Sequence, residues 1–241
     1  MNPKRVLVTG GSGDIGGAIC VALARDGWQA IVHANSNRER AEAVAARIRE
    51  DGGNADVAAF DVTDAAATHA AIDDLLRSGP IQALVHNAGI HDDGPMAGMT
   101  EAQWRRVIDV SLHGFFHVTQ PLLLPMARGR FGRVVAVSSV AATLGNRGQA
   151  NYAAAKSALH GAAKSLAREM ASRNITVNVV APGIIEGRLT ETLFSPEQVK
   201  AMIPAARTGT PAEVAGVVAF LCSDVAGYVN GQVIGVNGGM A

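Results

Sequence analysis

The fold of this chain is decided by residues 6–16, which read VLVTGGSGDIG. A short β-branched run enters a glycine-rich turn, and an Ala-rich segment of helical period follows from Ile15 to Asp26. Glycines in such a turn permit a tight bend, let the backbone approach a pyrophosphate and direct the helix N-terminus at its negative charge. A glycine turn alone is a weak signal, but this one joins the first strand to the first helix and therefore predicts a dinucleotide site.

The same alternation of strand and helix continues along the chain. Seven short hydrophobic runs are separated by longer segments of helical period, at residues 6–9, 30–33, 56–60, 83–86, 134–138, 175–180 and 233–236. Because these runs are nearly continuous rather than alternating, both faces of the sheet are expected to be covered. We predict an α/β fold with one doubly wound (Rossmann) domain over residues 1–241, a seven-stranded parallel sheet and helices on both faces. The irregular stretch 187–206 follows the carboxyl end of a strand and is the expected substrate lid.

Composition excludes several classes of partner. The 21 Lys and Arg residues balance the 21 Asp and Glu residues, so no general attraction to nucleic acid or to an anionic membrane is expected. Cys20 and Cys222 form no CxxC motif and the histidines are scattered, so we expect neither a disulfide nor a metal site. There is no apolar signal-peptide core and no run of about eighteen apolar residues, so the expected location is the cytoplasm.

The predicted cofactor contacts follow the ends of successive strands. Those expected at the pyrophosphate are Gly10, Ser12, Gly13, Asp14, Ile15 and Gly16. An NAD enzyme would carry a carboxylate for the ribose after the second strand, whereas residues 33–38 read HANSNR. Asn35, Ser36 and Arg38 can instead receive a 2′-phosphate, which favours NADP(H). The alternative is that Arg38 and Arg40 are only solvated cations at a helix start.

Two further turns belong to the same expected edge. Asp61, followed by Val62, can bond the adenine amino group, although Asp61 or Asp64 could equally cap the next helix. Asn87, Ala88 and Gly89 form a small-residue turn where the backbone must pass close to a nucleotide.

The chemistry is predicted to lie on Ser139, Tyr152 and Lys156. Tyr152 and Lys156 are four residues apart on a predicted helix and share one face, while Ser139 ends the preceding strand. Reduction of a ketone by hydride needs a proton donor, and a nearby ammonium is expected to lower the pKa of a tyrosine towards working pH. A serine hydroxyl can bond the carbonyl oxygen and stabilise its developing charge.

Together these motifs resemble the short-chain dehydrogenase/reductase family over essentially the full chain, and most closely its 3-oxoacyl-(acyl carrier protein) reductases. The motifs are the glycine turn, NAG at 87–89, Ser139, GQANYAAAK at 148–156, NVVAPG at 178–183, Gly231-Gln232 and NGG at 237–239. The resemblance implies NADPH-dependent reduction of a 3-oxoacyl group to the 3-hydroxyacyl form, in fatty-acid or polyketide/polyene-type synthesis. It implies that Ser139 orients the substrate, that Tyr152 is the acid/base, and that Lys156 also bonds the nicotinamide ribose. It places Pro182, Gly183 and Ile185 along the nicotinamide, although Pro-Gly is also an ordinary turn, and it implies a homotetramer.

Four positions depart from the family pattern. Asp14 stands where glycine is usual, and we expect its carboxylate to turn away from the phosphates. Ser111 matches the asparagine of the catalytic tetrad, and its hydroxyl can support a rearranged water relay. His86 replaces an asparagine, and Gly187 stands where a threonine often bonds the carboxamide.

The expected partner is an acyl carrier protein, which is acidic and needs a basic patch near the mouth of the site. Arg130 and Arg173 match positions where the relatives place docking cations, although cations at helix ends also complement the helix dipole. Two alternatives stay open: a reductase or dehydrogenase of a free small alcohol or ketone, and a non-catalytic nucleotide-binding subunit.

Overall fold

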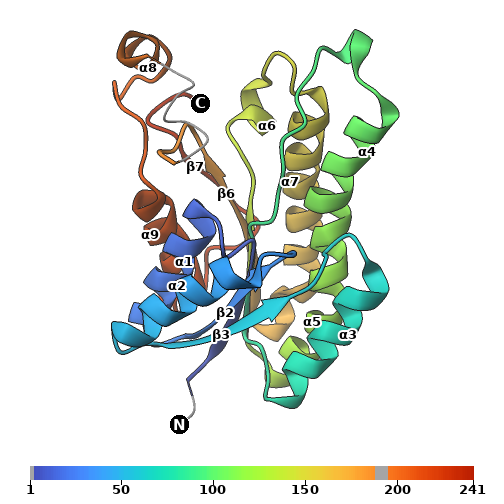
Figure 1. Cartoon of the computed structure of the whole chain (residues 1–241). Coiled ribbons are helices and arrows are strands. Elements are labelled where there is room, and N and C mark those ends of the chain that lie inside the picture. The colour runs from blue at the N-terminus through green and yellow to red at the C-terminus, as the bar shows by residue number, and fades with distance from the viewer. Residues whose placement is uncertain (1–2, 188–194) are drawn as a thin grey trace.

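The core of the computed structural model, which describes residues 3–187 and 195–241, is a parallel sheet with strand order β3-β2-β1-β4-β5-β6-β7 (Figure 1). The seven strands are β1 (Arg5–Thr9), β2 (Gln29–Ala34), β3 (Asn54–Ala59), β4 (Ala83–His86), β5 (Gly132–Val137), β6 (Ile175–Pro182) and β7 (Val233–Val236). The predicted doubly wound, seven-stranded parallel sheet is therefore confirmed. The order reverses between β1 and β4, and this is where such sheets bind ligands at their carboxyl edge.

Helices cover both faces of the sheet, as Figure 1 shows. One face carries α1 (Asp14–Arg25), α2 (Arg38–Glu50) and α9 (Pro211–Cys222). The opposite face carries α3 (Ala65–Arg77), α5 (Gly114–Gly129) and α7 (Ala150–Met170), with α4 (Glu101–Ile108) against α7. Because side chains alternate along a strand, Val6 and Val8 of β1 enter the first core and Leu7 enters the second.

One long predicted helix is divided by a π turn. The sequence predicts a single helical segment from Glu101 to about Ala127, and the structure places a π segment, Asp109–His113, between α4 and α5. There His86 Nε2 donates to the carbonyl oxygen of Ser111 at 3.0 Å. A side chain that competes for a helix carbonyl favours such a local bulge, and bulges of this kind are frequent at functional sites.

Four short helices and turns complete the described part of the fold, three of them at the carboxyl edge. They are the 3-10 turn η1 (Met96–Gly98), α6 (Ala141–Leu144), the 3-10 turn η3 (Ala171–Arg173, at the opposite edge) and α8 (Pro196–Met202). The predicted lid lies in part outside the described residues, because 188–194 are not among them. Its two flanks are joined by paired backbone: Glu186 N donates to Gly209 O at 2.8 Å and Gly209 N to Ile184 O at 2.9 Å.

Both cysteines are free and buried, and burial raises the pKa of the Cys222 thiol to about 12. Within the described ranges no helix has the length and apolar character needed to cross a membrane.

Candidate active site

The glycine turn after β1 is shaped so that its main chain can closely approach a ligand. Gly10 has a φ of +63°, and a Cβ on Gly16 would lie only 2.2 Å from Gly10 O. Gly13 is the N-cap of α1 and contributes no side-chain cap, so the first amides of the helix face the end of the turn. These features fit a pyrophosphate at the helix N-terminus.

His33, which sequence reasoning did not assign, holds this turn in place. Its Nδ1 accepts a hydrogen bond from Gly10 N at 3.1 Å and its Nε2 donates to Phe60 O at 2.9 Å. Burial lowers the pKa of His33 to about 4, so the ring is neutral and its acceptor is available at neutral pH. On the other side of the turn, Asn87 Nδ2 donates to Thr9 O and Gly10 O, both at 3.2 Å.

His86 links three of the predicted site segments. Thr9 Oγ1 accepts from the amides of Asn87 and Ala88, each at 3.1 Å, and donates to His86 Nδ1 at 3.1 Å. His86 Nε2 then donates to Ser111 O in the π turn. Burial, assisted by the charge of Lys156, lowers the pKa of His86 to about 3. His86 thus connects β1 and the NAG turn, through Thr9, to the main chain of Ser111.

The ribose end is open and basic. Asn35, Ser36 and Arg38 are exposed at the end of β2 and the start of α2. Arg40 Nη2 also donates to Ser12 O at 3.2 Å, which brings this second cation to the glycine turn. The described surroundings therefore suit a 2′-phosphate, and Arg40 joins the set that the sequence predicted.

The two aspartates predicted near the adenine, Asp61 and Asp64, both form hydrogen bonds within their own loop and helix start. Asp61 Oδ1 accepts from Thr63 N at 2.9 Å and from Thr63 Oγ1 at 2.8 Å, while Asp64 caps α3. The capping alternative is therefore confirmed for Asp64. Val62 is buried in the core against Gly114, so any cofactor contact it makes must come from its backbone.

Ser139, Tyr152 and Lys156 come together at the carboxyl edge between β5 and α7. Tyr152 is hydrogen-bonded to Ser139, and Lys156 Nζ lies 5.8 Å from the centroid of the Tyr152 ring. Lys156 is only 2% exposed, and its Nζ donates to Val137 O at 2.9 Å. The three residues are placed as a ketone-reducing site requires.

The pKa of Tyr152 differs from the sequence expectation. Burial raises it, the hydrogen bond from Ser139 acts in the opposite direction, and the charge of Asp93 raises it further. Lys156, whose own pKa burial lowers to about 8, does not outweigh the effect of burial on the pKa of Tyr152. The expected lowering of the tyrosine pKa by lysine is therefore absent from the described chain by itself.

Ser138, the neighbour of Ser139, anchors the catalytic helix. Its Oγ donates to Lys156 O at 3.0 Å and accepts from His160 Nε2 at 2.8 Å. The two consecutive serines therefore have different contacts: Ser138 bonds the backbone of α7, and Ser139 bonds Tyr152. The sequence shows the serine pair, but only the fold separates their roles.

Ser111 lies beside the lysine with an unsatisfied hydroxyl. Its side chain is fully buried, and among the described residues its Oγ has no hydrogen-bond partner. A Cβ on Gly89 would lie 2.8 Å from Lys156 Nζ and 3.5 Å from Ser111 Oγ, so Gly89 leaves the space between them open. A buried hydroxyl of this kind calls for a water or ligand partner.

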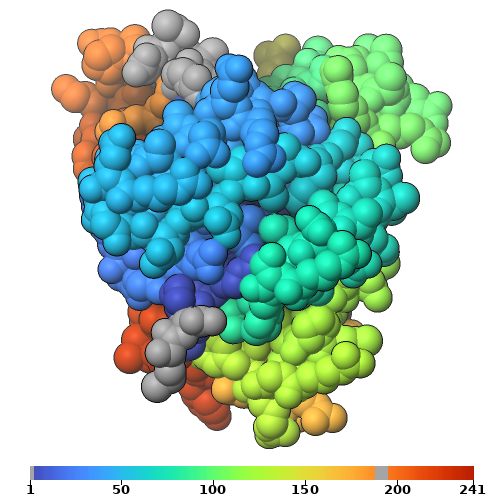
Figure 2. Space-filling model, turned by 60° about the horizontal axis from the view of Figure 1, so that its bottom comes forward, coloured from blue at the N-terminus to red at the C-terminus, as the bar shows by residue number. Residues whose placement is uncertain are grey.

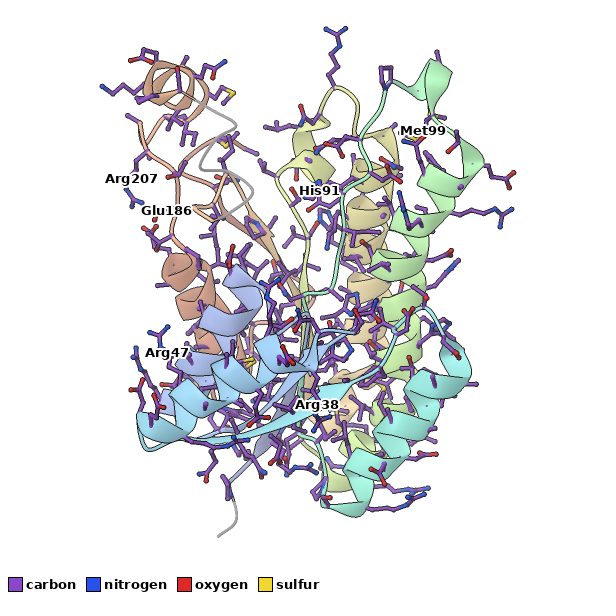
Figure 3. The ribbon with its side chains drawn as sticks, in the orientation of Figure 1. Arg38, Arg47, His91, Met99, Glu186 and Arg207 are labelled. Carbon is purple, nitrogen blue, oxygen red and sulfur yellow. The ribbon has the colours of Figure 1, made fainter. Side chains whose placement is uncertain are left out.

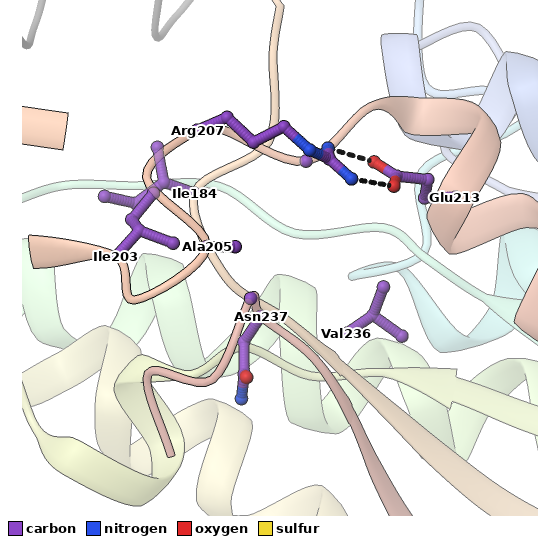
Figure 4. A pocket seen from close by; sticks show the side chains of 9 residues that line it. Ile184, Ile203, Ala205, Arg207, Glu213, Val236 and Asn237 are labelled. Carbon is purple, nitrogen blue, oxygen red and sulfur yellow. Dashed lines mark hydrogen bonds and ion pairs between the residues drawn. The ribbon is translucent and has the colours of Figure 1, made fainter. Parts of the chain in front are cut away.

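The segment around the end of β6 lies at the same carboxyl edge. Pro182 O accepts from Val140 N at 2.7 Å, and a Cβ on Gly183 would meet Asn237 Cα at 2.8 Å. Ile185 is buried and pairs with Gly209 at the base of the lid. Figure 4 shows a small pocket at this base, walled by the bidentate Arg207–Glu213 ion pair, with nitrogen–oxygen distances of 2.9 and 2.6 Å.

Two of the sequence departures meet across this edge. A Cβ on Gly187 would lie 2.8 Å from Asp14 Oδ2, so the carboxylate is directed at Gly187. A threonine at position 187 would require the flexible Asp14 carboxylate to turn aside. The two departures are therefore neighbours, and the expectation that Asp14 avoids the phosphates stays a prediction.

Arg130 and Arg173 lie at the opposite edge of the sheet. Asn174 Nδ2 donates to Arg130 O at 3.2 Å, so the two arginines belong to one region, and Figure 2, which brings this edge forward, shows the end of α5 at the surface. Tyr152 is near the start of the 21-residue helix α7 and Arg173 follows its end, about 30 Å away. The expectation that this patch lies at the mouth of the site is therefore wrong within one chain.

Comparison with known proteins places the chain among reductases. A family model described as "Enoyl-(Acyl carrier protein) reductase" matches residues 11–241. The protein named 3-oxoacyl-(acyl carrier protein) reductase FabG in Aggregatibacter actinomycetemcomitans is 44% identical over 239 residues, covering 98% of this chain and 99% of the relative. Proteins of the same name are 43% identical in Staphylococcus aureus Mu50, covering 98% of both chains, and 42% identical in Escherichia coli K12, covering 98% and 97%.

Proposed function

Because the chain belongs to the short-chain dehydrogenase/reductase family, we propose that it reduces a 3-oxoacyl group on an acyl carrier protein to the 3-hydroxyacyl form with NADPH. The observation that carries the proposal is the arrangement of half-buried Ser139 and Tyr152 beside buried Lys156 at the carboxyl edge of the sheet. The names of full-length relatives at 42–44% identity support the same reaction. The proposed setting is fatty-acid or polyketide-type synthesis in the cytoplasm.

The residues present fit a bound dinucleotide, which supplies the hydride. Gly10, Ser12, Gly13, Asp14, Ile15 and Gly16 would hold its pyrophosphate, and Asn87, Ala88 and Gly89 would pass beside it. Asn35, Ser36 and Arg38, assisted by Arg40, would receive the 2′-phosphate that distinguishes NADP(H). Asp61 and the Val62 backbone would face the adenine, while Pro182, Gly183 and Ile185 would line the nicotinamide.

Residues of the chain bind the substrate oxygen and supply its proton. Ser139 holds the ketone oxygen and Tyr152 donates the proton that completes the alcohol. Lys156, with its pKa lowered to about 8 by burial, is charged at neutral pH and stabilises the tyrosinate that remains. Ser111 offers its unsatisfied hydroxyl to a water next to Lys156, through which the proton is replaced.

The surroundings of the site suit an acyl group delivered by an acidic carrier. The exposed apolar side chains at this edge are Met96, Leu144 and Met202. Arg147 is exposed five residues before Tyr152 and is a cation at the mouth within the same chain. Arg130 and Arg173 can serve a site only across a subunit boundary, which the proposed homotetramer provides.

Exposed apolar residues support that assembly. Phe116 and Leu124 of α5 are 60% and 65% exposed in the single chain, and Tyr228 near β7 is fully exposed. Large apolar side chains gathered on a helix face mark an interface between proteins. Light scattering of the purified protein gives the oligomeric state directly.

The test of the function is NADPH consumption with acetoacetyl-carrier protein and with acetoacetyl-CoA, with NADH as the cofactor control. Preference for the carrier substrate and for NADPH is the expected result. Arg147→Glu, compared with Arg130→Glu and Arg173→Glu, then shows which cations contribute to the preference for the carrier. A crotonyl-carrier arm distinguishes ketone reduction from the enoyl reduction named by the family model.

Two outcomes would overturn the proposal. Turnover of free ketones with indifference to the carrier would favour the reductase of a small alcohol or ketone. Tight NADPH binding without turnover of any ketone would favour the non-catalytic nucleotide-binding subunit. Tyr152→Phe is the matched control, because an enzyme loses turnover with this change whereas a nucleotide sensor is indifferent to it.

A further inference from the structure

The loop after β4 places an imidazole against the catalytic phenol. The rings of His91 and Tyr152 are stacked, with centroids 4.1 Å apart and planes inclined by 24°. Figure 3 shows His91 on this loop next to α7. None of the roles described above uses this histidine, although its ring atoms all lie within a few ångströms of the reacting tyrosine.

Neighbouring side chains fix which nitrogen of His91 carries the proton. Gln149 Oε1 accepts from Asn146 Nδ2 at 2.9 Å, and Gln149 Nε2 donates to Asp93 Oδ2 at 2.8 Å, so the orientation of the amide is determined at both ends. The same Nε2 lies 3.3 Å from His91 Nδ1. Asp93 Oδ1 faces the same nitrogen from farther away, at 3.7 Å. Because the amide NH₂ group is the closer neighbour and only donates, we assign Nδ1 as the acceptor, which leaves the proton of the neutral ring on Nε2.

The ring is neutral at neutral pH and its donor is available. Burial lowers the pKa of His91, Asp93 partly opposes this, and the charge of Lys156 lowers it further. The side chain is 47% exposed, and within residues 3–187 and 195–241 no group is hydrogen-bonded to its Nε2. The described neighbours therefore leave one N–H donor beside Tyr152.

The loop that carries His91 is held on both sides. Asp92 forms an ion pair with Arg106 of α4, and its carbonyl oxygen accepts from Asn151 Nδ2 at 2.9 Å. Gly94 N donates to Gly148 O at 2.8 Å. A donor held by a rigid loop keeps its position before substrate arrives, as selective recognition requires.

We propose that His91 is a specificity-determining residue that donates its Nε2–H to the thioester carbonyl of a 3-oxoacyl substrate. This rests on the proposed function, in which Ser139 and Tyr152 bind the C3 ketone oxygen. The C1 carbonyl is two carbons from C3 and is therefore within reach of a donor beside the phenol; in the proposed orientation it lies on the side that the stacked imidazole covers. The site thereby selects 1,3-dicarbonyl thioesters over isolated ketones.

The test compares two substrates that differ only at C1. One is the acetoacetyl thioester of N-acetylcysteamine, and the other is the 3-oxobutyl thioether, in which a methylene replaces the C1 carbonyl. In His91→Phe, which keeps a stacking ring but lacks the donor, kcat/KM for the thioester falls about tenfold, the value of one hydrogen bond. For the thioether, kcat/KM changes by less than about twofold; if it is not turned over, its inhibition constant is compared instead.

Two controls separate the explanations. His91→Gln, whose amide N–H can replace Nε2–H, regains part of the thioester activity, and NADPH affinity is unchanged in both variants. Equal losses on thioester and thioether would overturn the proposal, since His91 would then act only through the ring of Tyr152. Unchanged kinetics on both would also overturn it. Failure of the wild-type protein to reduce both this thioester and acetoacetyl-carrier protein would instead overturn the proposed function, and the role of His91 with it.

Discussion

Two adjacent glycines of α1 should respond oppositely to the same substitution. Gly16 and Gly17 both lie in the first turns of the helix, where replacing glycine by alanine normally stabilises by up to about 1 kcal/mol. At Gly17 an added Cβ meets its nearest atoms at 3.5 Å, which is ordinary contact. At Gly16 it would lie 2.2 Å from Gly10 O and 2.8 Å from Asn87 Nδ2, where backbone has to move.

The magnitudes follow from these contacts. Overpacking costs about 1–3 kcal/mol, so we expect Gly16→Ala to lower the free energy of unfolding by that amount and Gly17→Ala to raise it by about 0.5–1 kcal/mol. For a domain of this size, each kcal/mol shifts Tm by about 2–4 °C. Because Gly10 is displaced, Gly16→Ala should also weaken NADPH binding, whereas Gly17→Ala should not.

Thermal unfolding and fluorescence titration with NADPH measure both effects. Gly161→Ala is the reference for helix propensity alone, since nothing lies within 4 Å of a Cβ at that position of α7. If Gly16→Ala proved as stable as Gly17→Ala and bound NADPH equally well, the close packing of the glycine turn against α1 would be refuted.

Three further outcomes are expected. Gly187→Thr should weaken NADPH binding by turning the Asp14 carboxylate away from position 187, and adding Asp14→Gly should restore it; additive effects in the double-mutant cycle would contradict the pairing. His33 has a pKa of about 4 in the fold against 6.5 as its ordinary value, so the unfolded chain protonates first and the free energy of unfolding falls as pH drops from about 6.5 to about 4. That loss is on the order of 3 kcal/mol, and urea titrations should show a flatter pH dependence in His33→Asn, which keeps an acceptor for Gly10 N. Ser111→Ala should lower kcat about tenfold with no loss of Tm, because the hydroxyl it removes makes no bond within the described chain; a fall in Tm with kcat unchanged would indicate a structural role.

The departures from the family pattern act in pairs. His86 donates to the Ser111 carbonyl, so the histidine of one strand end shapes the π turn that carries the altered tetrad residue. Asp14 and Gly187 are close enough that a side chain at 187 would change the direction of the Asp14 carboxylate. For Asp14 and Gly187, substituting one residue without the other is therefore expected to cost more than substituting both.

The amino-acid sequence was enough to predict the fold class and the number of strands, and it pointed to Ser139, Tyr152 and Lys156 as the candidate site. These depend on signals that are local in the chain: hydrophobic runs with helices between them, a glycine turn after the first strand, and a four-residue spacing on one helix face. A right-handed parallel sheet then brings the strand ends to one edge without further information.

Only the tertiary structure decided the roles that join distant segments. His33 reaches Gly10, Gln149 reaches both Asp93 and His91, and Lys156 is buried against Val137, and each contact joins segments separated in the chain by a strand or a helix. The pKa of Tyr152 depends on burial, which residue spacing does not report. Arg130 caps α5 and Arg173 follows α7, and both lie at the edge opposite the site, because the whole length of α7 separates Arg173 from Tyr152.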